Sequence, residues 1–234
     1  VARMYDPLGW VAPATLEGKK LRQALERNHP KADWDFLLPA DETKEWHNLA
    51  KSYTILQQFE LPRTFAIENE THRCYHVFCD ASEIAIGAVM YSISYENNRY
   101  KINIVTAKSK INPLPKQPKS KKKTARDLQI LPSGDVEMIE TKQVPLQINR
   151  MELNAALLGA RLVETIKLRL EKDPIIHFWS DSQVALQWIY KGPYTGAEFV
   201  DTRIKKILKT TQARQWQHCP GICLLYTSDA ADEE

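Results

Sequence analysis

Three carboxylates stand where an enzyme could use them. Asp80 follows an alternating run that begins at His72, and Asp181 follows a short apolar run at 175–179. Glu152 lies on the apolar stripe of the helical pattern at 151–170, in line with small and aliphatic residues one and two turns further on. A charge on that stripe is costly unless a partner compensates it.

These acids together predict a site for divalent cations. Three ionised carboxylates at one site repel each other by about 4 kcal/mol per pair at 4 Å and an effective dielectric constant of 20, so the cluster favours a bound cation. Ligands that are all oxygen favour Mg²⁺ or Mn²⁺ over Zn²⁺. Two such ions roughly 4 Å apart could activate a water and stabilise the leaving oxygen of a phosphodiester. The hypothesis from the residues is a metal-dependent nuclease.

Each acid also has an ordinary structural explanation. Asp80 could be a turn residue at the end of a strand, and Asp181 could cap the helix that follows it. Glu152 could pair with Arg150 or Arg161 on its own helix. The order of the surrounding elements favours the shared site over these separate explanations.

Hydrophobic periodicity predicts an α/β domain around the acids. Strands are expected at 72–80, 87–95 and 100–107, followed by a helix at 151–170 and a fully buried strand at 175–179. Helices at 182–190 and 199–210 and a last strand at 216–219 complete the order βββαβααβ. This order predicts a mixed five-stranded sheet with helices on both faces. Upstream, proline-marked breaks separate a helical pattern after Pro13 from a second one at 42–56.

Composition restricts the class of protein. The chain has 234 residues, 43% hydrophobic and 26% charged, which excludes a disordered tail, a collagen-like fibre and a disulfide-rich mini-protein. It contains no apolar stretch of membrane-spanning length and no basic then apolar secretion signal, and four cysteines fit a reduced intracellular protein. We therefore expect an intracellular protein that is not secreted.

The chain divides into three parts on these patterns. Residues 1–65 form a partly helical segment, residues 66–222 the α/β domain, and residues 223–234 a tail that looks like a translated sequencing adapter and is set aside. Without the tail the protein loses four acids and no bases, so its net charge rises from +3 to +7. Inside the domain, 112–147 is expected to be an extended loop, with five prolines and a basic run that includes Lys121, Lys122 and Lys123. These lysines could contact phosphates; a solvated linker is the alternative, since the run lacks interleaved aromatics.

Several motifs resemble one family. They are Phe-Cys-Asp-Ala-Ser at 78–82, Arg-Met-Glu-Leu-Asn-Ala-Ala at 150–156 and Trp-Ser-Asp-Ser at 179–182. Together they resemble the ribonuclease H domain of reverse transcriptases from BEL/Pao-type LTR retrotransposons. The segment at 5–13, with Trp34-Asp35 and Leu61-Pro62-Arg63, is similar to the connection region that follows the polymerase in those polyproteins.

The resemblance implies a specific activity. Asp80, Glu152 and Asp181 would hold two Mg²⁺ or Mn²⁺ ions, and a metal-bound water would cleave the RNA strand of an RNA/DNA hybrid. Ser82, Asn154, Ser182 and Gln183 would contact the nucleic acid. The polymerase module of the same polyprotein would be a partner, in the cytoplasm or in a virus-like particle. The family's fourth metal ligand and final helix have no counterpart in this chain.

Other functions remain as alternatives. A catalytically inactive remnant that only binds nucleic acid is the first. An aspartic peptidase, sometimes associated with the Pao label, is disfavoured because the chain has no Asp-Thr-Gly or Asp-Ser-Gly. A transposase or integrase is disfavoured by the connection-like segment. Zinc at His72, Cys74, His76 and Cys79 is disfavoured because Cys79 would point to the opposite face of the strand, and His218 is given no catalytic role.

Overall fold

The computed structural model describes residues 5–33, 35–60, 72–96, 99–113, 148–170 and 173–221, together with the backbone of two short strands at 128–130 and 136–138. Lys121, Lys122, Lys123 and the tail at 223–234 lie outside the described residues, so the expectations for them stay predictions. Within the described residues, no helix is both long enough and apolar enough to cross a membrane.

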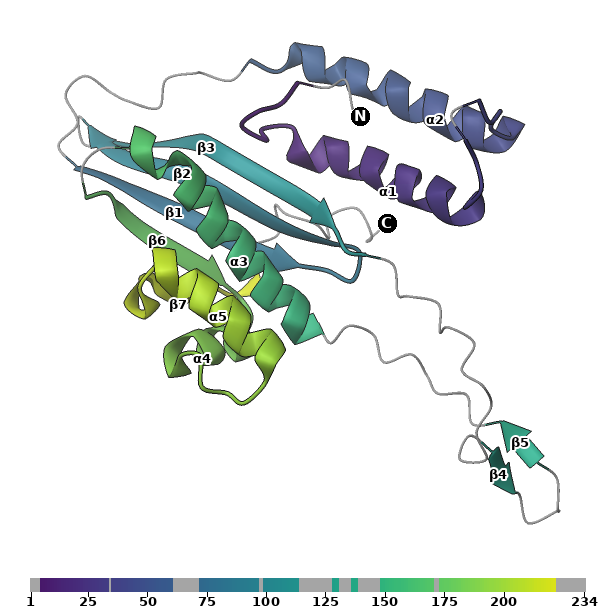
Figure 1. Ribbon diagram of the computed structural model, residues 1–234. Helices are drawn as coiled ribbons and strands as arrows, with labels where there is room; N and C mark the ends of the chain where they lie inside the picture. The colour runs from purple at the N-terminus through teal and green to yellow at the C-terminus, as the bar shows by residue number, and fades with distance from the viewer. Residues whose placement is uncertain are drawn as a thin grey trace.

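The centre of the molecule is a five-stranded mixed sheet (Figure 1). Its strands lie in the order β3-β2-β1-β6-β7; the first three are antiparallel neighbours, whereas β1, β6 and β7 run parallel. The bounds are β1 His72–Ala81, β2 Ala85–Glu96, β3 Arg99–Ile111, β6 Ile175–Ser180 and β7 Trp216–His218. The expected mixed five-stranded fold is therefore confirmed, with the first three strands longer than their sequence patterns indicated.

Alternation along the strands separates the two faces of the sheet. In β1, Tyr75, Val77 and Cys79 are at most 1% exposed, whereas the residues between them are half-buried. Strand β6 alternates in the same way, and Ile175 is 59% exposed. The prediction that β6 is buried on both faces was wrong, because an apolar run of this length fits a one-sided strand equally well.

Helix α3 (Ile148–Ile166) covers the buried face by packing against β1 and β2 (Figure 1). It starts three residues earlier than the pattern predicted and ends in a short 3-10 helix, η3 (Lys167–Arg169). Gly159 lets the helix approach closely, since a Cβ built there would lie 2.3 Å from the Cys79 Sγ. Small residues on this face therefore set the height of α3 above the sheet.

Two further helices complete this side. They are α4 (Gln183–Lys191), which ends at Gly192 with φ +77°, and α5 (Glu198–Thr210). Helix α5 packs on α3, with Ile204 and Ile207 fully buried between them and the sheet. After the 3-10 helix η4 (Ala213–Gln215), Trp216 stacks on Phe178 of β6 with ring centroids 4.6 Å apart. This stacking anchors the last strand to the core.

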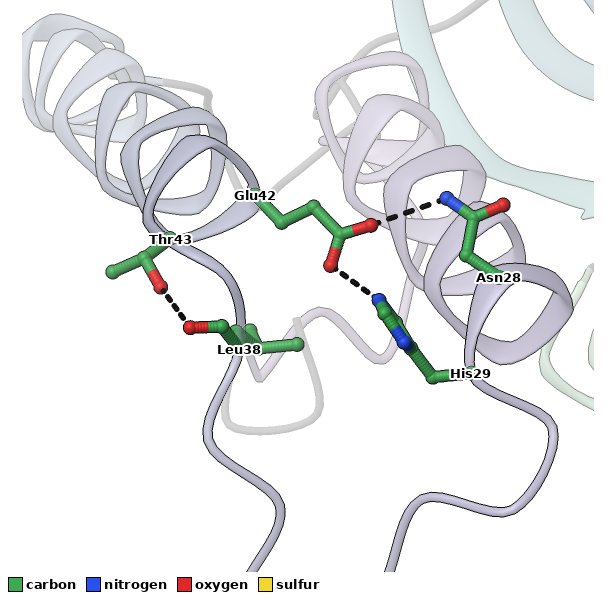
Figure 2. A network of polar contacts seen from close by, with 5 residues as sticks. All are labelled: Asn28, His29, Leu38, Glu42 and Thr43. Carbon is green, nitrogen blue, oxygen red and sulfur yellow. Dashed lines mark hydrogen bonds and ion pairs between the residues drawn. The ribbon is translucent and has the colours of Figure 1, made fainter.

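The N-terminal helices are α1 (Ala12–Asn28), α2 (Ala40–Ser52) and the 3-10 helix η1 (Tyr53–Gln58). At their junction, shown in Figure 2, the Glu42 carboxylate receives the Asn28 amide at 3.1 Å and contacts the His29 Nε2 at 2.6 Å. The Asn28 hydrogen bond and then His29 hold the pKa of Glu42 below its usual value. Nearby, the Thr43 hydroxyl donates to the Leu38 carbonyl at 3.2 Å and steadies the start of α2.

Helix α1 and the turn before it are bonded to the outer edge of β3. The Ala107 amide donates to the Leu8 carbonyl at 2.7 Å, and the Trp10 indole donates to the Val105 carbonyl at 3.1 Å. Gly9, at φ +72°, makes this approach possible, since a Cβ there would lie 1.7 Å from the Ala107 oxygen. The predicted boundary near residue 65 falls in a stretch outside the described residues and stays a prediction, while the segment before it is fastened to the sheet.

The expected long loop at 112–147 contains a small antiparallel pair. Strands β4 (Leu128–Ile130) and β5 (Val136–Met138) pair with each other, Leu128 opposite Met138. The expectation of an unbroken extended loop was therefore wrong at these residues. Two apolar-polar-apolar triplets flank a Pro-Ser-Gly-Asp sequence at 132–135, which is typical of a hairpin, and the prolines around them hid this signal.

Candidate metal centre

Two of the acids are brought together by parallel strands. In the register of β1 and β6, Phe78 lies opposite Trp179, and Asp80 and Asp181 each follow two residues later. Because parallel strands end at the same edge of a sheet, both side chains reach the same crevice. The placement predicted from the two strand ends is thus what the structure shows.

The third acid comes from α3. Glu152 lies in the second turn of the helix, only 7% exposed, on the side that faces the sheet. One carboxylate oxygen of each of Asp80, Glu152 and Asp181 lies within 4.8 Å of the others. The structure therefore gathers all three predicted acids at one point, and among the described residues this group has the geometry to hold a metal ion.

Burial and repulsion make Glu152 the unusual member of the group. Burial, and then the neighbouring Asp80 and Asp181, raise the pKa of Glu152 to about 8, with only partial opposition from the Ala81 amide. Its Oε2 atom is buried and accepts no hydrogen bond. Such a group is stable with a proton or beside a cation, so the residues present fit a divalent ion bound through oxygen.

The structure does not support a helix-capping role for Asp181 or an ion pair of Glu152 with a neighbouring arginine. Ser182, rather than Asp181, caps α4, accepting a hydrogen bond from the Ala185 amide at 3.2 Å. Among the described residues, the ion pairs do not include Glu152, so neither Arg150 nor Arg161 compensates it. A shared site accounts for the buried Glu152 where a local pairing does not.

Four further predicted residues lie near the acids with different local roles. The Ser82 hydroxyl closes the turn between β1 and β2 against Ala85, and Ser182 caps α4. Asn154 accepts a hydrogen bond from Arg203 at 2.6 Å, and Gln183 is exposed at the first position of α4. Contact with nucleic acid stays a prediction for all four.

Asn112 is a residue at the site that the sequence did not single out. Its amide donates to the carbonyls of Ser82 and Glu83, at 2.9 and 3.2 Å, and lies 3.1 Å from the Met151 sulfur. It therefore ties the turn after Asp80 to the helix that carries Glu152. In the sequence it stands at the start of the proline-rich stretch, where no periodic signal marks it.

Of the strand residues weighed for zinc, Cys74 and His76 contact each other, Sγ to Nε2 at 3.3 Å, while Cys79 and His76 also have other partners. Cys79 is buried under α3, on the opposite face from His76. The His76 Nδ1 accepts a hydrogen bond from the Trp179 indole at 2.9 Å, and the two rings stack at 5.7 Å. The His72 side chain lies outside the described residues. These contacts give Cys79 and His76 packing roles.

Sheet order, helix placement and the acid cluster together define an α/β domain of the ribonuclease H-like class. A family model described as "Pao retrotransposon-like RNaseH-like domain" matches residues 1–121, more than half of the chain. The chain belongs to this family, which confirms the resemblance found in the sequence. The matched region includes Asp80, and Glu152 and Asp181 lie beyond it.

The chain is also similar to solved structures. RNase H1 from the archaeon Halobacterium salinarum NRC-1 is 12% identical over 67% of this chain and 92% of its own, with a TM-score of 0.33. A foamy viral protease-reverse transcriptase in complex with dsDNA is 12% identical over 94% of this chain, with a TM-score of 0.42. This chain covers 39% of the viral protein. No curated protein matches the sequence.

Proposed function

We propose that this chain is the ribonuclease H module of a retrotransposon reverse transcriptase, which hydrolyses the RNA strand of RNA/DNA hybrids with two divalent metal ions. The observation that carries the proposal is the convergence of Asp80, Glu152 and Asp181 within 4.8 Å, with Glu152 buried and one of its oxygens unpartnered. Membership of the Pao family supports the retrotransposon setting.

The residues have distinct tasks in this proposal. Asp80, Glu152 and Asp181 would hold the ions, Mg²⁺ or Mn²⁺, which when bound would supply Lewis-acid stabilisation of charge on the phosphodiester oxygens. Glu152 must give up its proton to become a ligand, because its pKa is raised to about 8. Ser82 and Ser182 hold the two strand ends that carry the aspartates in shape through their turn and cap hydrogen bonds.

The proposed setting includes further partners. The polymerase module of the same polyprotein would deliver the hybrid, in the cytoplasm or inside a virus-like particle. Ser82, Asn154, Ser182, Gln183 and Lys121, Lys122 and Lys123 are proposed contacts for the nucleic acid.

The direct test is cleavage of an RNA/DNA hybrid labelled on the RNA strand. We expect Mg²⁺-dependent cleavage that Asp80→Asn, Glu152→Gln and Asp181→Asn each reduce by at least about a hundredfold, since each removes a charged ligand. The matched control is Glu164→Gln, an exposed acid on the same helix as Glu152. Cleavage that survives Asp80→Asn would refute the site assignment.

A second function is a module that binds hybrid without cutting it. The described residues bring together three acids and no fourth, which favours this alternative. Gly221, which follows the last strand, lies beside Asp181: a Cβ built on Gly221 would be 3.1 Å from the Asp181 Oδ2. Hybrid binding without Mg²⁺-dependent or Mn²⁺-dependent cleavage in the wild-type chain would support this alternative.

A further inference from the structure

A cavity of about 660 Å³ lies where the N-terminal segment meets the sheet. Its lining comes from three parts of the chain that are distant in the sequence: the turn before α1 with the first half of α1, the last part of β3, and the second half of α3. The acids of the metal centre do not line it. We call this space the β3 cavity. Its volume is within the range of sites that bind small molecules.

The β3 cavity has an excess of positive charge. Four cations and one acid line it, namely Lys19, Lys108, Lys110, Arg161 and Asp6. The Asp6 carboxylate oxygens are used at the start of α1, where they accept the amides of Trp10 and Val11 at 2.9 and 3.0 Å. None of the ion pairs among the described residues includes a cation of the cavity. The lining therefore carries a net charge of +3.

The environment of Lys19 shows that this charge is unfavourable in the free protein. Its ammonium group donates to the carbonyl and the hydroxyl of Ser109, both at 3.0 Å, and is half-buried. Burial lowers the pKa of Lys19; the neighbouring Asp6 opposes this effect and Lys108 adds to it. An ammonium has three N–H donors, and Ser109 takes two of them. An anion in the cavity would use the third and would offset both the lost hydration and the repulsion.

We propose that the β3 cavity binds the phosphate group of a small phosphate monoester through Lys19, Lys108 and Arg161. A phosphate monoester carries close to two negative charges at pH 7, which matches the net charge of the lining better than a carboxylate does. The guanidinium of Arg161 presents a fork of donors to two phosphate oxygens, while the lysines act as point charges. Leu158 and Leu162 also line the cavity and would contact the organic part of the ligand.

A ligand in the β3 cavity would couple the N-terminal segment to the α/β domain. Its contacts come from α1, β3 and α3 together, so the complete site exists only while the N-terminal segment is docked on β3. A ligand that binds one of two states stabilises that state by mass action. Phosphate binding would therefore hold the N-terminal segment on the sheet.

The test is calorimetric titration of the chain with adenosine 5′-monophosphate in EDTA, at constant ionic strength. EDTA prevents divalent ions from joining the phosphate to the acids of the metal centre. We expect a dissociation constant on the order of 0.1 to 1 mM. Lys108→Gln and Arg161→Gln should each raise it about threefold to tenfold, since each removes one exposed cation from the site. Lys101→Gln, an exposed cation of β3 outside the cavity, is the matched control and should leave it unchanged.

Two further ligands and one further variant define what is bound and where. Inorganic phosphate should compete with adenosine 5′-monophosphate, and adenosine, which lacks the phosphate, should not bind. Asp80→Asn should bind like the wild type; tighter binding in this variant would place the phosphate at the acids and overturn the inference. The inference is also wrong if neither phosphate compound binds at up to about 10 mM, or if the three lysine and arginine variants have equal affinities.

Hydrogen exchange at Ala107 tests the coupling directly. The Ala107 amide donates to the Leu8 carbonyl at 2.7 Å, so it exchanges when the N-terminal segment opens. Adenosine 5′-monophosphate at ten times its dissociation constant should slow this exchange about tenfold in the wild type. At the same concentration, Lys108→Gln should show a smaller effect and Lys101→Gln the full one. Exchange at Ala107 that stays the same when the ligand is bound would place the ligand elsewhere and contradict the proposal.

Discussion

At Glu152, folding favours the protonated carboxyl group, whereas metal binding requires the ionised carboxylate. The side chain is 7% exposed and its pKa is raised from 4.5 to about 8. The folded protein therefore binds this proton more tightly than the unfolded chain does. The stabilisation of the fold by this proton is fully present below the pKa that Glu152 has in the unfolded chain. It is lost as the pH rises through the pKa that Glu152 has in the folded protein. Without metal, the fold should lose stability between about pH 4.5 and pH 8.

Replacing the Glu152 carboxylate tests how much its ionised form destabilises the fold. In EDTA at pH 8.5, Glu152→Gln should raise the free energy of unfolding by about 1 to 3 kcal/mol, because it removes a buried unpaired charge. At pH 4 the gain should largely disappear. Urea unfolding at both pH values measures the difference, with Glu164→Gln as the control on the same helix. A variant that is less stable than wild type at pH 8.5 would contradict this account.

Metal binding should also depend on the Glu152 proton. Below pH 8, the affinity for Mg²⁺ or Mn²⁺ should fall by up to tenfold per pH unit, because the metal must displace one proton from Glu152. Above pH 8 the affinity should level off. Calorimetric titration with Mn²⁺ in buffers of different ionisation enthalpy counts the protons released. Release of none at pH 7 would show that Glu152 is already ionised.

Among the elements, α3 matters most because it carries Glu152 and sets its depth. Small residues, above all Gly159 over Cys79, bring the helix down onto β1 and β2. The height of the helix therefore determines how closely Glu152 approaches the two aspartates at the strand ends.

A methyl group at this contact should lift the helix. Gly159→Ala should destabilise the fold by about 1 to 3 kcal/mol, because the new Cβ would lie 2.3 Å from the buried Cys79 Sγ. The higher helix propensity of alanine offsets up to about 1 kcal/mol of this. Chemical unfolding measures the loss. Gly87→Ala, where a Cβ meets nothing within 4 Å, is the control.

Double substitution identifies the cause of the loss. If the Cys79 sulfur is the obstacle, Cys79→Ala should relieve most of the penalty of Gly159→Ala, and the two changes should be strongly non-additive. Additive effects would place the strain elsewhere.

The sequence predicted elements best where one physical signal dominates. Alternation and helical periodicity placed the main strands and helices to within a few residues, and strand ends located Asp80 and Asp181. What it missed depends on contacts between distant segments. The bridge from Asn112 to Met151, 39 residues apart, leaves no periodic trace, and neither does the meeting of Arg150 with Phe199.

On the scale of the whole molecule, the N-terminal segment is fastened along β3. Bonds to this strand and its end come from Leu8, Trp10, Lys19 and Gln23. The sequence predicted the helix but not its docking, because the partners on β3 and at Asn112 are backbone groups: the Ala107 amide donates, and the carbonyls of Val105, Ser109 and Asn112 accept. Backbone groups have no signature in side-chain patterns. The upstream segment thus contributes directly to the stability of the sheet.

Gly9 is the residue on which this docking depends most. Gly9→Ala should cost more than about 2 kcal/mol, since it combines a positive φ with a Cβ 1.7 Å from the Ala107 oxygen. Gly196→Ala, at φ +79° with open space around its Cβ, carries the backbone cost alone and should lose about 1 kcal/mol. Thermal unfolding compares the two. Equal losses would mean that the contact with β3 contributes little.

The same docking affects how the protein behaves among other copies of itself. An uncovered edge strand offers a row of amides and carbonyls onto which another chain can add, the first step of sheet aggregation. Along β3 the outward groups at Val105, Ala107 and Ser109 are already bonded to the N-terminal segment. Strand addition is thus blocked along this part of β3, and β7, three residues long, forms the other edge of the described sheet. Removing the N-terminal segment would expose these backbone groups to strand addition as well as weaken the fold.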